Sequence, residues 1–294
     1  MKVYKSEKAK ARIYDTYDRL LSQWNVKKEE RDVSTTYGMT HVIICGDERN
    51  PPLVLFHGVG DDSALMWLYN AEVLSRHFCV YAIDTLGGPG KSRPNENYNK
   101  DFELIKWIDE ILGDLKLERV YMAGVSNGAY MTQLYGVYRP DKVIRLVCMA
   151  GSVPVGHSSP MKTMMKIFLP EALFPTMRNT IKLIRKLSGK NSGVFTDNPT
   201  VMEHYQALLK GFNNMAMRFH KVVSLNDEQI DMLREKTLYL MGEADPFAVL
   251  GGKAMLLRYK MNAQFFPDVG HGINHEIAEE INRILVDFML GYII

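Results

Sequence analysis

Short apolar runs alternate with longer amphipathic stretches along most of the chain after Pro51-Pro52. Runs of four to eight apolar residues have the length of strands, whereas the longer stretches have the length and spacing of helices. We expect strands at 53–56, 78–83, 119–125, 143–150, 237–241 and 263–267, and helices near 62–76, 101–116, 127–139, 246–260 and 274–291. This alternation predicts an α/β fold with a mostly parallel central sheet and helices on both faces.

Two segments depart from this alternation. The first, residues 1–32, has apolar residues at helical spacing (Ile13, Tyr17, Leu20, Leu21 and Trp24) and predicts an N-terminal amphipathic helix, which is followed by a hairpin at 33–45. The second, residues 152–231, has helical spacings and no strand pattern, and is too long for a plain loop. We therefore expect a core formed by residues 33–151 and 232–294, with 152–231 as an inserted helical domain.

Composition narrows the function classes. The chain has 294 residues, 46% of them hydrophobic, so it can bury a large core, and its net charge of +2 is too balanced for nucleic acid as the main partner. Its three cysteines, Cys45, Cys79 and Cys148, lie in strand-like runs without a CxxC pair and are expected to be buried free thiols. With no signal-peptide pattern and no apolar run of membrane-spanning length, a soluble, cytoplasmic protein is expected.

The segment Gly124-Val125-Ser126-Asn127-Gly128 matches the G-x-S-x-G nucleophile elbow. In such an elbow the serine occupies a strained turn between a strand and a helix, and the flanking glycines prevent clashes. The pentapeptide alone is weak evidence, because it arises by chance in about one in ten chains of this length. An apolar strand before it and a plausible helix after it favour Ser126 as a nucleophile over a small-residue packing turn.

A second turn, His57-Gly58-Val59-Gly60, directly follows the strand at 53–56. Acyl transfer develops a negative charge on an oxygen, which needs preorganised N–H donors. The glycines let the backbone turn and offer the amide of Val59, while Asn127, at the start of the helix after Ser126, offers a second amide. We therefore expect Val59 and Asn127 to form an oxyanion hole, with His57, Gly58, Gly60, Gly124 and Gly128 supporting the loops.

Together these residues resemble the α/β-hydrolase superfamily, and in particular capped carboxylesterase-type serine hydrolases of bacteria. The turn from Asp84 to Ser92 is also similar to the family's Asp-x-x-G-x-G-x-S turn after the fourth strand. The resemblance covers residues 33–151 and 232–294, and the insertion stands where the family usually places its cap, or lid. It implies a catalytic triad in the chain order nucleophile, acid, histidine.

In that order, the acid should follow Ser126 in the sequence and the histidine should follow the acid. Asp245 follows the strand at 237–241, at the edge of the sheet where open α/β folds bind ligands, and it matches the family's pattern better than Glu243. His271 lies between two glycines before the last helix and can reach both partners, whereas His275 is the fallback and lies within that helix. Some relatives carry the acid after the sixth strand, but Ala150-Gly151-Ser152 offers no carboxylate there.

These residues predict a serine hydrolase that cleaves a carboxylic ester of a small or medium-sized, largely apolar substrate through an acyl-enzyme. No cofactor and no metal are required. The same triad also serves acyltransferases, thioesterases, amidases, perhydrolases and C–C hydrolases, so the fold does not define the substrate. A ligand-binding receptor that retains the triad is the alternative from another class.

Two further patterns have simpler explanations. Gly88-Pro89-Gly90-Lys91-Ser92 fails as a phosphate-binding loop, because the motif needs glycine where the chain has Thr85. Residues 161–190 are rich in lysine, arginine and methionine, which fits the solvated face of a cap helix and also allows weak contact with a membrane surface. The sequence predicts no transmembrane segment and leaves the oligomeric state open.

Overall fold

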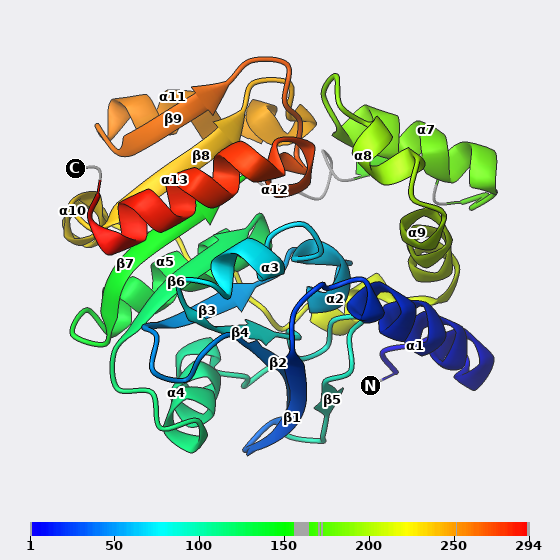
Figure 1. Cartoon of the computed structure of the whole chain (residues 1–294), viewed down its shortest axis with the longest axis horizontal. Coiled ribbons are helices and arrows are strands. Elements are labelled where there is room, and N and C mark those ends of the chain that lie inside the picture. Colours follow the sequence, from blue (N-terminus) through cyan, green and yellow to red (C-terminus); the bar gives the residue numbers. More distant parts are fainter. Residues whose placement is uncertain (1, 156–164, 170, 172, 251, 293–294) are drawn as a thin grey trace.

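A nine-stranded sheet runs through the part of the chain that the computed structural model describes, residues 2–155, 165–169, 171, 173–250 and 252–292 (Figure 1). The strands are β1 (Lys28–Thr35), β2 (Gly38–Cys45), β3 (Pro52–Phe56), β4 (Cys79–Ile83), β5 (Arg93–Pro94), β6 (Val120–Val125), β7 (Val143–Met149), β8 (Thr237–Gly242) and β9 (Asn262–Phe266). Their order is β1-β2-β4-β3-β6-β7-β8-β9, with β5 paired to β2. The pairs from β4 to β9 are parallel, whereas β2 is antiparallel to both β1 and β4.

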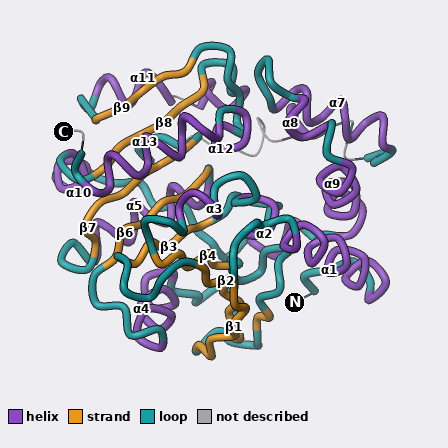
Figure 2. The backbone as a smooth tube through the Cα atoms, viewed as in Figure 1, coloured by secondary structure: helices purple, strands orange, loops and turns teal. Residues whose placement is uncertain are grey.

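Helices cover both faces of this sheet, as Figure 2 shows. One face packs on α2 (Ser63–Met66), α3 (Ala71–Leu74) and α13 (Ala278–Leu290), and the other on α4 (Leu104–Asp114), α5 (Asn127–Tyr138), α10 (Asp227–Arg234) and α11 (Gly252–Arg258). In β3, Leu53 and Leu55 enter the first core, while Val54 and Phe56 enter the second. A strand buried on both faces needs an uninterrupted apolar run. The mostly parallel sheet with helices on both faces confirms the predicted α/β architecture.

The hairpin at the start of the sheet is longer than predicted. Its first strand begins at Lys28 rather than near residue 33, so residues 28–32 belong to the sheet and not to the N-terminal segment. The strand was missed because Glu29, Glu30, Arg31 and Asp32 are exposed and show no apolar alternation. Charged side chains on an edge strand discourage pairing with another chain.

Three of the predicted helices are broken. The helix expected at 62–76 is divided into α2 and α3, and Asn70 between them is buried and donates to Asn274 O (3.0 Å) and Asn282 Oδ1 (2.8 Å). The helix expected at 274–291 is divided at Ile277 into α12 (Ile273–Glu276) and α13. The stretch at 246–260 forms a 3₁₀ helix, η2 (Pro246–Leu250), followed by α11.

The described residues between β7 and β8 contain helices and no strand. These helices are α7 (Met177–Leu187), α8 (Gly193–Thr196), α9 (Pro199–Gly211), the 3₁₀ helix η1 (Asn214–Met217) and α10, which runs across the expected boundary at residue 231. Lys182 and Lys186 pair with buried Glu171, so part of the basic surface is neutralised within the chain. Residues 161–164 lie outside the described residues, and membrane contact by this segment stays a prediction.

The N-terminal helix α1 (Glu7–Ser22) packs against α9 and α2 of the same chain (Figure 1). Arg12 and Arg19 both form ion pairs with Glu203 of α9. The apolar side of α1, including Ile13 and Tyr17, is buried in the core. The helix therefore ties the inserted segment to the sheet.

Cys45, Cys79 and Cys148 are buried free thiols, as predicted, and burial raises the pKa of Cys148 to about 12. Among the helices formed by the described residues, none is long and apolar enough to cross a bilayer.

A buried histidine on β2 predicts how stability depends on pH. The ring nitrogens of His41 lie 3.0 Å from Glu30 Oε2 and 3.0 Å from Asp32 Oδ1, while Lys91 and Arg93 also pair with these carboxylates. Burial lowers the pKa of His41, but Glu30, Asp84 and Asp32 outweigh it and raise the net pKa above 6.5. A raised folded-state pKa stabilises the protein below about pH 6.5, and this contribution is lost as pH rises through the folded-state value.

We therefore expect the free energy of unfolding to fall by about 1 kcal/mol or less as pH rises above 6.5, because the two carboxylates are partly exposed. Urea unfolding at several pH values measures it, and the slope should be smaller in His41→Gln. An identical slope in both proteins would contradict the assignment.

Candidate active site

Ser126 occupies a strained turn between β6 and α5. Its backbone has φ 55° and ψ −115°, a conformation that residues with a Cβ rarely adopt. A Cβ on Gly124 would lie 2.2 Å from the backbone carbon of Gly128, and a Cβ on Gly128 would lie 2.2 Å from Phe56 O. The two glycines are therefore required by the close approach of α5 to β6 and β3, which is the geometry of a nucleophile elbow.

This packing predicts opposite effects of two glycine-to-alanine substitutions. Gly128→Ala would force backbone atoms apart, and we expect it to lower the free energy of unfolding by about 2–4 kcal/mol. Gly113→Ala, at an exposed position of α4 with nothing within 4 Å of the added Cβ, should raise it by up to about 1 kcal/mol through helix propensity. Chemical denaturation measures both. If both substitutions changed the free energy of unfolding equally, the close contact at Gly128 would not destabilise the alanine variant, and the prediction would be wrong.

The loop after β3 lies against the elbow. A Cβ on Gly58 would lie 3.4 Å from Ser126 Cβ. Fully buried His57 accepts from Thr85 N–H through Nε2 (2.8 Å), so its Nδ1–H donates to Gly58 O (2.8 Å). His57 thus fixes the conformation of this loop through backbone contacts.

Two backbone N–H groups point to an oxyanion site. The N–H groups of Val59 and Asn127 have no hydrogen-bond acceptor among the described residues, and both residues line the same cavity as Ser126. Asn127 begins α5, so the positive end of the helix dipole adds to its donor. Such a pair of donors can hold an oxygen that becomes negatively charged.

Asp245 and His271 form a hydrogen-bonded pair. Asp245 follows β8 and is 5% exposed, with Oδ2 2.8 Å from His271 Nδ1 and Oδ1 accepting from Phe247 N–H (2.8 Å). Nδ1–H therefore donates to the carboxylate, which leaves Nε2 as an acceptor. His271 Nε2 makes no hydrogen bond to any described residue and is available to a hydroxyl in the cavity.

The two fallback residues have other partners. Glu243 is exposed and pairs with Lys253, away from the histidine. His275 lies in α12, where Nε2–H donates to Leu65 O (3.0 Å) and burial lowers the pKa to about 4. The neutral, backbone-bound imidazole of His275 therefore helps hold α2 in place.

Sequence analysis missed a carboxylate that supports the histidine loop. Glu276 accepts from Gly270 N–H (3.0 Å) and from Gly189 N–H (2.8 Å), while His271 N–H donates to Leu187 O (2.7 Å). Leu187 and Gly189 belong to the inserted segment, so the loop that carries His271 is bound to this segment. No sequence motif marks Glu276, because its partners are backbone groups brought together by the fold.

The turn after β4 is also anchored by a carboxylate. Asp84 accepts from Tyr17 O–H (3.0 Å), Ser63 N–H (3.0 Å) and Lys91 N–H (2.7 Å). A Cβ on Gly90 would lie 2.2 Å from Asp84 Cγ, so glycine is needed there for packing. The glycines of this turn thus have a structural role.

The candidate residues open into one cavity of about 940 Å³. Ser126, His271, Asp245, Val59 and Asn127 all line it. Much of the remaining wall is apolar, including Met66, Phe168, Leu183, Leu208, Phe212 and Met241. Because several of these come from the inserted segment, this segment encloses the side of the cavity opposite the sheet.

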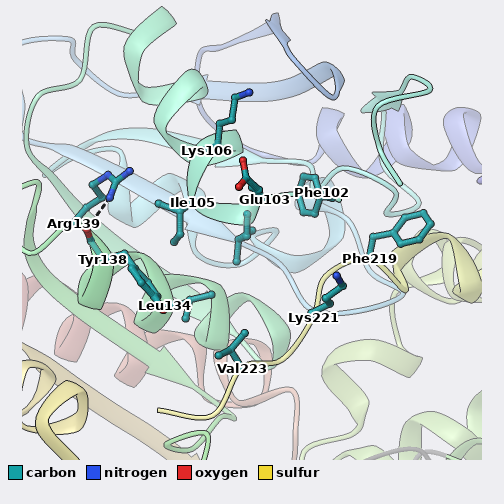
Figure 3. Close-up of a pocket in the computed structure, with 11 residues that line it drawn as sticks. Phe102, Glu103, Ile105, Lys106, Leu134, Tyr138, Arg139, Phe219, Lys221 and Val223 are labelled. Atoms are coloured by element: carbon teal, nitrogen blue, oxygen red, sulfur yellow. Dashed lines mark hydrogen bonds between the residues drawn. The ribbon is translucent and has the colours of Figure 1, made fainter. Parts of the chain in front are cut away.

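A second pocket, of about 470 Å³, lies outside this site (Figure 3). Its side chains come from α4, from the end of α5 and from residues 219–223, and none of the candidate catalytic residues lines it. Lys221 and Val223 face this pocket, whereas Val222 and Ser224 line the larger cavity. The segment between η1 and α10 therefore forms a shared wall.

A search of the described ranges found no group of three or more histidine, cysteine or acidic side chains placed to hold a metal ion. The histidine–carboxylate pair that lines the cavity with Ser126 is Asp245–His271, in which one imidazole nitrogen is already bound to the carboxylate.

Comparisons with known proteins agree with this geometry. Residues 51–184 match the family described as alpha/beta hydrolase fold. Carboxylesterase YbfK of Bacillus subtilis (strain 168) is 35% identical over 136 residues, 46% of either chain, and the uncharacterized carboxylesterase nap of the same organism is 27% identical over 94% of this chain and 92% of its own. The crystal structure of naproxen esterase from Bacillus subtilis superposes with a TM-score of 0.80 at 23% identity, covering 97% and 99% of the two chains. The chain therefore has the α/β-hydrolase fold, and its carboxylesterase relatives indicate a hydrolase of the carboxylesterase type.

Proposed function

We propose that the protein is a serine hydrolase that cleaves a carboxylic ester of a small or medium-sized, largely apolar substrate through an acyl-enzyme. One observation carries this proposal: Ser126 in its strained turn, the Asp245-bound His271 and two unfilled backbone N–H groups line a single cavity. Acyl transfer requires a nucleophile, a base and an oxyanion site in contact with the same substrate carbonyl.

In the first half-reaction, His271 Nε2 takes the hydroxyl proton of Ser126 while Oγ attacks the ester carbonyl. The carbonyl oxygen becomes negative and is held by the N–H groups of Val59 and Asn127. Asp245 keeps Nδ1 protonated and stabilises the imidazolium. The carbonyl then re-forms, the C–O bond to the alcohol breaks, and Nε2–H gives its proton to the leaving oxygen.

In the second half-reaction, water takes the place of the alcohol. His271 Nε2 removes a proton from this water as its oxygen attacks the acyl carbon. Collapse of the second tetrahedral intermediate returns the proton to Ser126 Oγ and releases the carboxylic acid. The enzyme is then in its starting protonation state.

The shape of the cavity supports the substrate class. A volume of about 940 Å³ lies at the upper end of the usual range for small-molecule sites, and the apolar wall favours a hydrocarbon acyl or alcohol group. His-Gly-Val-Gly differs from the His-Gly-Gly-Gly loop of one large esterase and lipase group. In that group the His-Gly-Gly-Gly loop goes with activity on esters of bulky tertiary alcohols, so the substrates that we propose do not include such esters.

Covalent labelling combined with an ester series tests the proposal. A fluorophosphonate should add once to the protein, and peptide mass spectrometry should locate the adduct on Ser126. p-Nitrophenyl esters of increasing chain length should show a maximum at short or medium acyl chains. A label on another residue, or no hydrolysis of any ester in the series, would overturn the proposal.

Added nucleophiles separate hydrolysis from the other activities that this triad supports. With butanol or a thiol present, a hydrolase releases mainly the free acid, whereas an acyltransferase diverts most of the acyl group to the added acceptor. A protein that takes up one acyl group per molecule and then releases none would fit the receptor alternative instead.

A further inference from the structure

A buried carboxyl group faces the cavity next to the proposed oxyanion loop and has no part in the proposed mechanism. Asp61 follows Gly60, is 9% exposed and lines the cavity. Its Oδ1 accepts from Asp62 N–H (2.9 Å), and its second oxygen has no partner among the described residues. A ligand that displaces water from this part of the cavity must offer that oxygen a partner, because leaving it unpaired in a largely apolar site is costly.

Burial and the neighbouring carboxylate keep Asp61 uncharged. Asp62 is fully buried, and its Oδ2 lies 2.7 Å from Nε2 of His204, which is also fully buried on α9. Burial would raise the pKa of Asp62, but His204 outweighs this and lowers it, so Asp62 carries the negative charge. Burial, and then the charge of Asp62, raise the pKa of Asp61 well above its ordinary value. Asp61 is therefore a neutral acid with an O–H to donate.

A second donor lines the same cavity. This donor is Tyr205, next to His204 on α9, and its hydroxyl has no partner in the described part of the chain. Burial raises the pKa of Tyr205 well above its ordinary value, and Asp61 contributes next. The phenol therefore stays protonated. Its ring packs near Phe195, with centroids 6.2 Å apart, which orients the hydroxyl.

We propose that Asp61 and Tyr205 form a polar subsite that binds an uncharged acceptor oxygen, such as an ether, ketone or hydroxyl oxygen, on the substrate away from the scissile ester. This inference rests on the proposed esterase function and specifies its substrate further. Two neutral donors in an apolar wall favour a neutral acceptor, and a substrate that lacks the acceptor leaves both donors unpaired.

Pairs of substrates test this subsite. Each pair consists of a p-nitrophenyl alkanoate and the ester in which one methylene is replaced by oxygen, with the oxygen moved stepwise along the acyl chain. Their ratio of kcat/KM is divided by the ratio of their alkaline hydrolysis rates, which removes the inductive effect of the oxygen. We expect a preference for the oxygen of about five- to tenfold at one position.

Variants identify the residues responsible. Tyr205→Phe keeps the ring and should lower the preference severalfold, whereas Tyr69→Phe, whose hydroxyl donates to Val194 O outside the cavity, should leave it unchanged. Asp61→Asn retains a donor and should keep most of the preference, while Asp61→Leu should abolish it. Because each ratio is internal to one variant, a general loss of folding or activity cancels.

The outcomes separate this inference from the esterase proposal. If the plain alkanoates are not hydrolysed, the esterase proposal itself fails. If they are hydrolysed but no position shows a preference, or Tyr205→Phe leaves the preference unchanged, the subsite is overturned. A matching amino-substituted ester that is preferred over the ether, in a manner that depends on Asp61, would also overturn it, because Asp61 would then bind a cation as a carboxylate.

Discussion

Ser126→Ala should hydrolyse p-nitrophenyl esters at least about a thousandfold more slowly than the wild-type protein, because it lacks the oxygen that attacks the carbonyl. The oxyanion donors and the cavity remain, so slow residual hydrolysis by water is expected. The substitution removes one oxygen and keeps the Cβ, and Ser126 N–H still donates to Met149 O (2.8 Å). The variant should therefore fold, which circular dichroism and the thermal midpoint will verify.

The matched control is another serine of the same cavity. Ser152 lines the cavity, and its hydroxyl donates to Gly252 O (3.1 Å). Ser152→Ala should retain activity within about tenfold, since it loses one ordinary hydrogen bond. If the two variants lost activity equally, or if Ser126→Ala kept wild-type kcat, the assignment of the nucleophile would be wrong.

Asp245→Asn should lower kcat by about ten-thousandfold with little change in KM. An amide at this position can donate its own N–H to His271 Nδ1, which moves the imidazole proton to Nε2 and leaves no base facing the cavity. Asp245 is 5% exposed and also accepts from Phe247 N–H (2.8 Å), an interaction that the amide oxygen can preserve. The loss therefore reports the tautomer of His271 rather than unfolding.

Glu243→Gln provides the control for charge. Glu243 lies two residues earlier on the same loop and pairs with Lys253 at the surface. Removing this charge should change kcat by less than about threefold, because exposed ion pairs contribute little. Similar losses from both substitutions would mean that the negative charge of the loop matters, and not the contact between Asp245 and His271.

Much of the architecture could be predicted because the sheet is buried on both faces. Strands such as β3 and β6 have to be apolar throughout, and this leaves a pattern that local sequence shows. β1 could not be recognised in that way, since its outer residues are charged and it is defined by its pairing with β2. The break between α2 and α3 depends on Asn70 meeting Asn274 and Asn282, which are distant in sequence.

Some residues of the candidate site could likewise be predicted from the sequence, and others could not. Ser126 and the loop at 57–60 could be found because backbone geometry requires glycines nearby, and glycines are visible in a sequence. Glu276 could not, because one of its partners, Gly189, is contributed by the inserted segment. His204 could not, because its partner Asp62, just before α2, is distant in sequence. The adjacent carboxyls Asp61 and Asp62, directly after the loop, were the available signal for a polar group at the cavity.

The position of the inserted segment between β7 and β8 affects how the chain is synthesised. The sheet can form as far as β7 before β8 exists, and β7 then has an edge of unpaired backbone N–H and C=O groups with which β8 later pairs. At about 5–20 residues per second, the ribosome needs several seconds to make residues 150–236. During that interval the nascent chain already carries Ser126 but neither Asp245 nor His271, so the proposed nucleophile precedes its base and the exposed edge must be kept from pairing with other chains.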